Sequence, residues 1–215
     1  MQKIKNLMLL TFLSFLLFSC GEYQKVLNKG TVEDQYKMAV KMYEIKKYGK
    51  AIRLFEKITP AYRGKPQMER IQFMVAQSNF NEKNYTTAGY FFDRFAKNYP
   101  SSSKLEEASF SSALSYKLAS PEFSKDPTDT NKALEAFQSF INTFPTSEKI
   151  DEANQHYKEL RYKLQKKYFE IAKTYYTTAD YDMRNYKAAI QAFDNLLSDY
   201  LGSEFKEEAL LYRLK

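Results

Sequence analysis

Apolar residues recur along most of this chain with the spacing of an amphipathic α-helix. One pattern occurs four times: an alanine, a phenylalanine four residues later, an apolar residue three further on, and an aromatic four after that. Steps of four, three and four place all four residues on one helical face, so each copy predicts an amphipathic helix. The copies are Ala51, Phe55, Ile58 and Tyr62; Ala88, Phe92, Phe95 and Tyr99; Ala133, Phe137, Phe140 and Phe144; and Ala189, Phe193, Leu196 and Tyr200.

Another helix with its own small residue precedes these copies. Ala39, Ala76 and Ala113 are spaced by 37 residues, and a small residue there lets the two helices of a pair approach closely. This is the arrangement of the tetratricopeptide repeat, whose A-x3-F…P half is matched well and whose W-x2-L-G half is matched poorly. We therefore expect an all-α fold, a tetratricopeptide-repeat (TPR-like) α-solenoid of helix pairs, with about four complete repeats and the start of a fifth. Its continuous core is expected to contain Phe92, Phe137 and Phe193.

A second signature follows the helix pairs. The segments that begin at Tyr99, Phe144 and Tyr200 align without gaps, and their Ser residues, with Pro100 and Pro145 in the first two, predict a turn. Two carboxylates then enter the first turn of the next helix, where they oppose the positive end of the helix dipole. These acidic pairs are Glu106 and Glu107, Asp151 and Glu152, and Glu207 and Glu208.

Three irregularities interrupt the repeats. About eight residues are inserted between Ser120 and Thr130, which predicts a loop. Residues Ile150 to Tyr176 contain no Gly or Pro, which predicts one long helix or two abutting ones. By alignment Ala209 begins a fifth repeat, and the sequence stops at Lys215 before its second helix. We expect either that the chain was trimmed or that a partner covers this end.

The first residues have the features of a lipoprotein leader. Lys3 and Lys5 precede an apolar stretch that is too short to span a bilayer and has the length of a signal-peptide core. Leu17-Phe18-Ser19-Cys20 then resembles the bacterial lipobox. We expect residues 1–19 to be a signal peptide, Cys20 to carry the covalent lipid, residues 20–31 to form a lipidated tether, and residues 32–215 to form the repeat domain. The alternative, an uncleaved leader with an incidental cysteine, is weakened because Cys20 is the only cysteine.

The charge distribution and the absence of catalytic motifs argue against several classes of function. The whole chain has a net charge of +7, and without Lys3 and Lys5 it has 31 basic and 26 acidic residues, or +5. These charges are interspersed without a Lys/Arg-rich block, so nucleic acid is not an expected partner. His156 is the only histidine, and we interpret it as a surface or packing residue. Nucleotide-binding, hydrolase and metalloprotease motifs are absent, so we expect no enzyme, no metal and no cofactor besides the lipid.

Two acidic segments faintly resemble calcium-binding loops. They are Asp126-x-Thr128-x-Thr130 and Asp180-x-Asp182, and neither has the turn glycine or a correctly placed Glu. We therefore interpret both as ordinary loops.

Together, the lipobox, the repeats, the proline-serine turns and the insertion resemble the YfiO family over residues 20–215. The resemblance implies a lipid-anchored outer-membrane protein that faces the periplasm. It also implies that the C-terminal repeats, from the long helix onward, dock on the periplasmic domains of the BamA barrel. The N-terminal repeats would receive the C-terminal targeting signal of unfolded outer-membrane proteins. The alternatives are another periplasmic TPR scaffold, for example one that organises cell-wall synthesis, and, less favoured, a muramidase on a helical frame.

The repeat register predicts which side chains would form the peptide-binding groove. Four positions of each first helix face the concave surface of a TPR array, which brings four aromatic residues and one arginine to a common wall. An aromatic chain end with its carboxylate would fit such a wall. The alternative is that these rings only pack against neighbouring helices. The candidate groove residues are Tyr36, Val40, Tyr43, Arg70, Phe73, Gln77 and Phe80.

Overall fold

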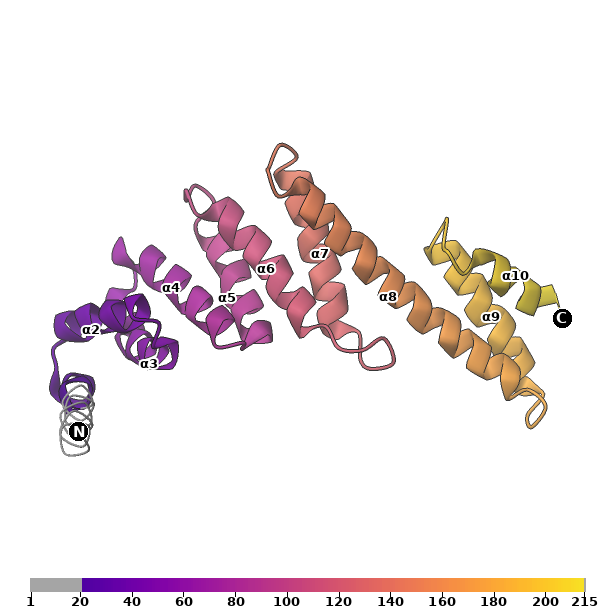
Figure 1. Ribbon diagram of the computed structural model, residues 1–215, viewed down its shortest axis with the longest axis horizontal. Helices are drawn as coiled ribbons and strands as arrows, with labels where there is room; N and C mark the ends of the chain where they lie inside the picture. The colour runs from indigo at the N-terminus through magenta and orange to yellow at the C-terminus, as the bar shows by residue number, and fades with distance from the viewer. Residues whose placement is uncertain (1–20, 215) are drawn as a thin grey trace, which may run out of the picture. The chain divides into compact units, whose positions relative to one another are not determined.

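The computed structural model of the protein describes residues 21–214, and every regular element in this range is a helix (Figure 1). Residues 21–29 are helical and precede the first pair. The remaining helices are α2 (Val32–Glu44), α3 (Tyr48–Ile58), the short 3-10 helix η1 (Thr59–Tyr62), α4 (Gln67–Asn81), α5 (Tyr85–Asn98), α6 (Leu105–Ala119), α7 (Thr128–Thr143), α8 (Ile150–Thr177), α9 (Arg184–Asp199) and α10 (Lys206–Leu214).

The helices pack as consecutive antiparallel pairs, which confirms the all-α TPR-like fold. α2 packs on α3, α4 on α5, α6 on α7 and α8 on α9, and α10 begins the next repeat against α9. The small residues allow this close approach, because each is fully or almost fully buried. They are Ala39 and Ala51, Ala76 and Ala88, Ala113 and Ala133, and Ala172 and Ala189.

The chain forms two compact units, one ending at Tyr99 and the other beginning at Pro100. In the second unit the buried residues form two clusters, one around Phe137 and the other around Phe193. The prediction of a continuous core is therefore wrong, although Phe92, Phe137 and Phe193 are each fully buried as expected. The N-terminal half of the long helix α8 packs in the cluster around Phe137, and its C-terminal half packs in the cluster around Phe193.

The turns before α6, α8 and α10 share one hydrogen-bond arrangement. In each, a serine hydroxyl accepts a bond from the backbone N–H two residues later: Ser102 from Lys104 and Ser147 from Lys149, both at 3.0 Å, and Ser203 from Phe205 at 3.2 Å. The acidic pairs then lie in the first turn of each helix, as predicted. No side chain caps α6 or α8 directly, and the carboxylates in their first turns stabilise the positive end of each helix dipole.

Ile150 to Thr177 form a single helix of 28 residues, in agreement with the sequence. The inserted residues before α7 form a loop, and Asp126 accepts a 2.9 Å hydrogen bond from the Thr128 backbone N–H, where α7 begins. Thr130 therefore lies within the helix and not in a loop, which corrects the expectation for that segment.

The leader and Cys20 lie outside the described residues, but the expected tether does not. Residues 21–29 are a packed helix: Tyr23 is only 2% exposed, and its hydroxyl donates a 3.2 Å bond to the Lys50 carbonyl. The Gln35 amide donates to the carbonyls of Val26 and Leu27, both at 3.2 Å. Tyr23, Val26 and Leu27 share one helical face, so this short segment has an apolar stripe that docks on the first repeat.

Candidate functional site

The predicted groove begins on α2, whose three candidate side chains are partly buried against the core of the first unit. Tyr36 contacts the ring of Tyr62 with centroids 5.4 Å apart, and Tyr43 contacts Tyr48 at 5.7 Å. Val40 packs on the same core. Both tyrosine rings therefore contribute to packing, and both residues remain partly exposed.

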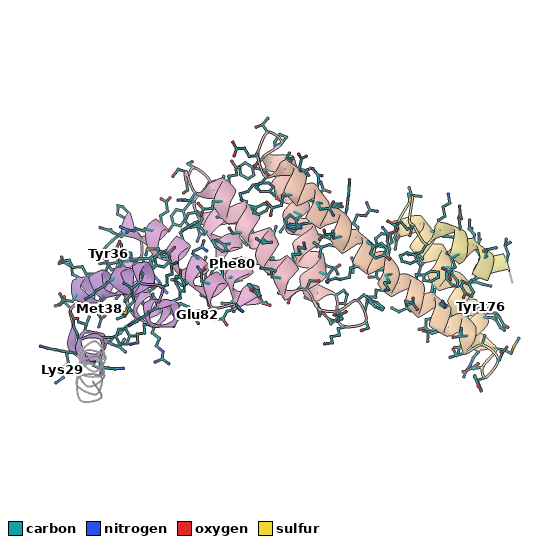
Figure 2. All side chains as sticks on the ribbon, viewed as in Figure 1. Lys29, Tyr36, Met38, Phe80, Glu82 and Tyr176 are labelled. Carbon is teal, nitrogen blue, oxygen red and sulfur yellow. The ribbon has the colours of Figure 1, made fainter. Side chains whose placement is uncertain are left out.

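The second half of the groove lies on α4 (Figure 2). Phe73 contacts Phe95 at 5.3 Å, and Phe80 contacts Tyr85 at 5.6 Å, so each ring packs on the second helix of its own pair. Gln77 is partly buried and Arg70 is exposed. Among residues 21–214 no carboxylate pairs with the Arg70 guanidinium, which leaves it free to bind an anion.

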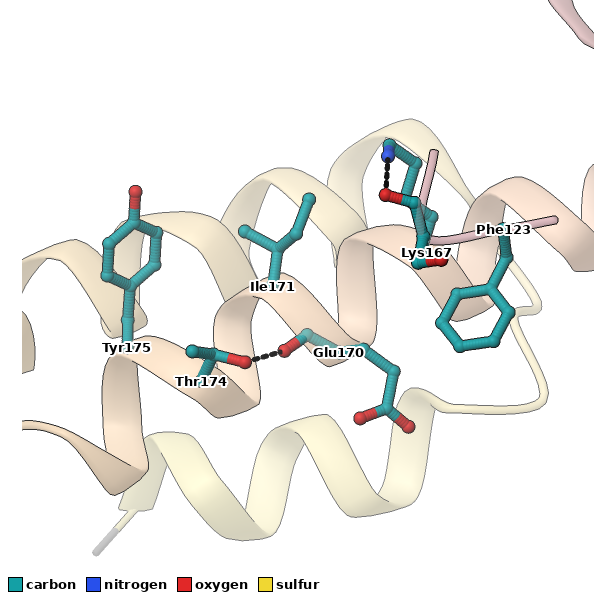
Figure 3. Close-up of a pocket in the computed structure, with 7 residues that line it drawn as sticks. Phe123, Lys167, Glu170, Ile171, Thr174 and Tyr175 are labelled. Atoms are coloured by element: carbon teal, nitrogen blue, oxygen red, sulfur yellow. Dashed lines mark hydrogen bonds between the residues drawn. The ribbon is translucent and has the colours of Figure 1, made fainter. Parts of the chain in front are cut away.

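A cavity in the second unit was not predicted. It has a volume of about 410 Å³ and lies between the inserted loop and α8 (Figure 3). The Phe123 ring lies at one end, and Ile171 and Tyr175 project from α8. At the Phe123 end the Lys167 ammonium donates a 2.7 Å bond to the Lys125 carbonyl, so this side chain helps to hold the loop. The only sequence signal for this cavity was the insertion itself.

Exposed apolar side chains gather in the second unit. Tyr181 is 92% exposed and Leu201 85%, and a stripe of Tyr168, Ile171 and Tyr175 follows one face of α8. Scattered exposed apolar residues are ordinary, but a concentration of them is typical of an interaction surface. The large exposed apolar residues from α8 onward are Tyr162, Tyr168, Ile171, Tyr175, Tyr181, Met183, Ile190, Leu201, Leu211 and Leu214.

The single histidine packs as predicted. The His156 ring lies 5.3 Å from Phe137, and its Nδ1 is 2.5 Å from the Lys117 ammonium. Lys117 also binds Glu159 at 2.7 Å, and this hydrogen bond lowers the pKa of the Glu159 carboxyl. Within the described part of the chain, His, Cys, Asp and Glu side chains form no cluster able to hold a metal ion.

Comparison with known proteins gives a consistent result over nearly the whole chain. The family model YfiO, described as an outer membrane lipoprotein, matches residues 28–215. The outer membrane protein assembly factor BamD of Rickettsia prowazekii is 27% identical over 186 residues, covering 83% of this chain and 69% of the relative. The protein of the same name from Haemophilus influenzae is 23% identical over 185 residues, covering 81% and 70%. In residues 21–214 no helix is both long and apolar enough to cross a membrane.

Proposed function

Because the chain belongs to the YfiO family of outer membrane lipoproteins, we propose that it is a non-catalytic component of the Bam complex, which folds and inserts outer-membrane β-barrel proteins. The observation that carries this proposal is the family match, which covers residues 28–215 and therefore all the helix pairs. The protein would be held at the periplasmic face of the outer membrane by the lipid on Cys20. Its task would be binding: a preformed surface beside the insertase raises the local concentration of substrate.

The first unit would bind unfolded outer-membrane proteins at the groove of α2 and α4. Its four aromatic residues are each partly exposed and would receive an aromatic side chain, and the exposed Arg70 guanidinium would pair with a terminal carboxylate. The ring contacts within each helix pair support this role, because they fix the rings before a peptide arrives.

The second unit would dock on the periplasmic domains of the BamA component. The support is the series of exposed apolar side chains on α8, α9 and α10, together with the cavity beside Phe123. Burial of these side chains would supply the apolar centre that protein interfaces require. Crosslinks to BamA confined to residues 32–100 would contradict this assignment.

Arg70 provides the sharpest test of the groove because it is exposed and its replacement leaves the ring contacts intact. Arg70→Gln is expected to weaken binding of a labelled peptide that ends in phenylalanine with a free carboxylate. A peptide with an amidated end should bind both proteins equally weakly. Arg63→Gln, the same exchange at another exposed arginine of the first unit, is the control. Equal binding by wild type and Arg70→Gln would place the peptide site elsewhere.

Tyr43→Ala and Phe80→Ala test the rings themselves. If the groove binds the peptide, both variants should bind it more weakly while their circular dichroism stays native. If both lose helicity, the rings are structural, since Tyr43 and Phe80 also pack on Tyr48 and Tyr85. Purification of the tagged lipoprotein from membranes tests the complex: recovery of BamA supports the proposal, whereas recovery of cell-wall synthases supports the alternative scaffold.

A further inference from the structure

The positive charge of the chain is distributed unevenly between its two ends. Residues 21–66 contain 11 basic and 5 acidic residues, a net charge of +6, whereas residues 67–215 contain 20 basic and 21 acidic residues, a net charge of −1. The whole excess therefore lies in the segment that follows Cys20 and forms the first repeat. It forms no continuous Lys/Arg run, because the residues come from three different helices and their turns.

The fold gathers several of these cations around the helix of residues 21–29. Lys25 and Lys29 lie on the helix and are exposed, and Lys29 points outward in Figure 2. From α3, Lys50 lies over the Tyr23 ring with its ammonium 4.9 Å from the centroid, and Lys57 donates a hydrogen bond to the Leu27 carbonyl.

Arg53 belongs to the same group. Burial raises the pKa of the Tyr23 hydroxyl, and the nearby Arg53 charge opposes that effect. Glu22, the one acidic residue of the helix, is 3.5 Å from Lys41. Apart from Lys41, the cations described around this helix have no carboxylate partner within residues 21–214. We call these five the basic patch: Lys25, Lys29, Lys50, Arg53 and Lys57.

We propose that the basic patch binds the anionic headgroups of the membrane in which the protein is anchored, so that the first repeat lies against the lipid surface. This inference rests on the proposed acylation of Cys20 for its geometry. Tyr23 is three residues from Cys20, a stretch of chain that spans at most about 11 Å. The Debye length at 0.1 M salt is about 10 Å, so cations around Tyr23 are within electrostatic range of the headgroups.

An anionic membrane fits this surface better than an acidic protein or nucleic acid does. The patch surrounds the segment that follows the lipidated cysteine. Because the helix of residues 21–29 is hydrogen-bonded to the first repeat, the patch has little freedom to turn away from the bilayer. Acyl chains combined with a basic patch are a known combination for firm attachment, because the lipid supplies apolar burial and the patch supplies attraction to anionic lipids.

Lysine footprinting of the acylated full-length protein tests the proposal. The protein is bound to vesicles of phosphatidylcholine alone, or of phosphatidylcholine mixed with phosphatidylglycerol, and treated with a membrane-impermeant acetylating reagent. Mass spectrometry then gives the modification rate of each lysine. On the anionic vesicles the rates at Lys25, Lys29, Lys50 and Lys57 should fall about fivefold, which is the fold-change that corresponds to an attraction of about 1 kcal/mol between one basic residue and an anionic surface. High salt should abolish the difference.

Two matched variants distinguish an effect of the basic patch from an effect of the net charge of the protein. Replacement of Lys25, Lys29 and Arg53 by Gln should abolish the protection that remains measurable at Lys50 and Lys57. Replacement of Lys158, Lys187 and Lys206 by Gln removes the same charge from exposed positions of the second unit and should leave the protection unchanged.

The outcomes distinguish the patch from the anchor. Failure of the acylated protein to associate with neutral vesicles would contradict anchoring by its lipid, while protection of the lysines on anionic vesicles would still support the patch. Equal modification rates on both vesicles, with association intact, would overturn the patch and leave the anchor standing. Stronger protection of the same lysines by short duplex DNA than by anionic vesicles would overturn the assignment to lipid.

Discussion

The ammonium group of Lys163 donates a 2.8 Å hydrogen bond to the Ser120 hydroxyl and so ties the long helix α8 to the loop before α7. The same ammonium donates a 3.1 Å bond to the Pro121 carbonyl. Burial lowers the pKa of Lys163, yet its three donors find oxygen acceptors in the loop. One turn later Lys167 holds the carbonyl of Lys125. Two lysines of one helical face therefore fix the insertion, which otherwise has little secondary structure of its own.

Lys163→Met should release this loop. Loss of hydrogen bonds from a charged donor is expected to lower the free energy of unfolding by about 1–2 kcal/mol, measured by urea denaturation. Tryptic cleavage after Lys125 should also become faster. Lys158→Met, an exposed lysine of the same helix, should change stability by less than about 0.5 kcal/mol. Identical cleavage rates for both variants would show that Lys163 does not hold the loop.

Phe137→Ala should destabilise the second unit strongly. Phe137 is fully buried and contacts Phe110 with centroids 6.0 Å apart, so its truncation leaves a cavity between α6 and α7. The expected cost is about 3–5 kcal/mol in denaturant unfolding. Tyr181→Ala removes a ring that is 92% exposed and serves as the control. A cost below about 1 kcal/mol for Phe137→Ala would be incompatible with this helix register.

Ser78 and Ser115 occupy equivalent positions of successive repeats, 37 residues apart, and both are fully buried. The Ser115 hydroxyl donates to the Ser111 carbonyl at 2.5 Å, whereas among the described residues the Ser78 hydroxyl has no hydrogen-bond partner. Ser78→Ala should therefore raise the free energy of unfolding by about 1 kcal/mol, because it removes a buried polar group that is unpaired. Ser115→Ala should lower it or leave it unchanged, and a gain at both positions would contradict this account.

Cys20→Ala should abolish acylation and leave a precursor that is not correctly released or sorted. The motif Leu17-Phe18-Ser19-Cys20 follows a short apolar core, and the chain has no other cysteine to accept a lipid on sulfur. Labelling cells with radioactive palmitate measures this directly. Equal label in wild type and Cys20→Ala would refute the assignment.

The repeating part of the fold could be predicted from the sequence because each helix pair uses the same few residues. Ala88 and Phe92 identify a helix and its buried face through steps of four, and Ile150 to Thr177 lack any residue that would break a helix. The helix of residues 21–29 was missed because its apolar face comprises only Tyr23, Val26 and Leu27, too few for a periodic signal.

The candidate sites were less predictable because they depend on contacts between segments far apart in the sequence. The groove register gave the residues of α2 and α4, but not the rings of Tyr48 and Tyr85 that pack on them. The cavity beside Phe123 depends on hydrogen bonds from lysines about 40 residues further along the chain, for which no local pattern exists. The basic patch could not be predicted, because its charges come together only when the helix of residues 21–29 packs on α3.

The helix α8 is 28 residues long, about 42 Å at 1.5 Å per residue, and it is built into two separate cores. Ala153 and Leu160 belong to the cluster around Phe137, and Phe169 and Ala172 belong to the cluster around Phe193. Both ends of α8 are therefore held by buried side chains, and the helix is continuous between them. A partner that binds the exposed apolar side chains near the C-terminal cluster would therefore contact the same continuous helix that packs against Phe137.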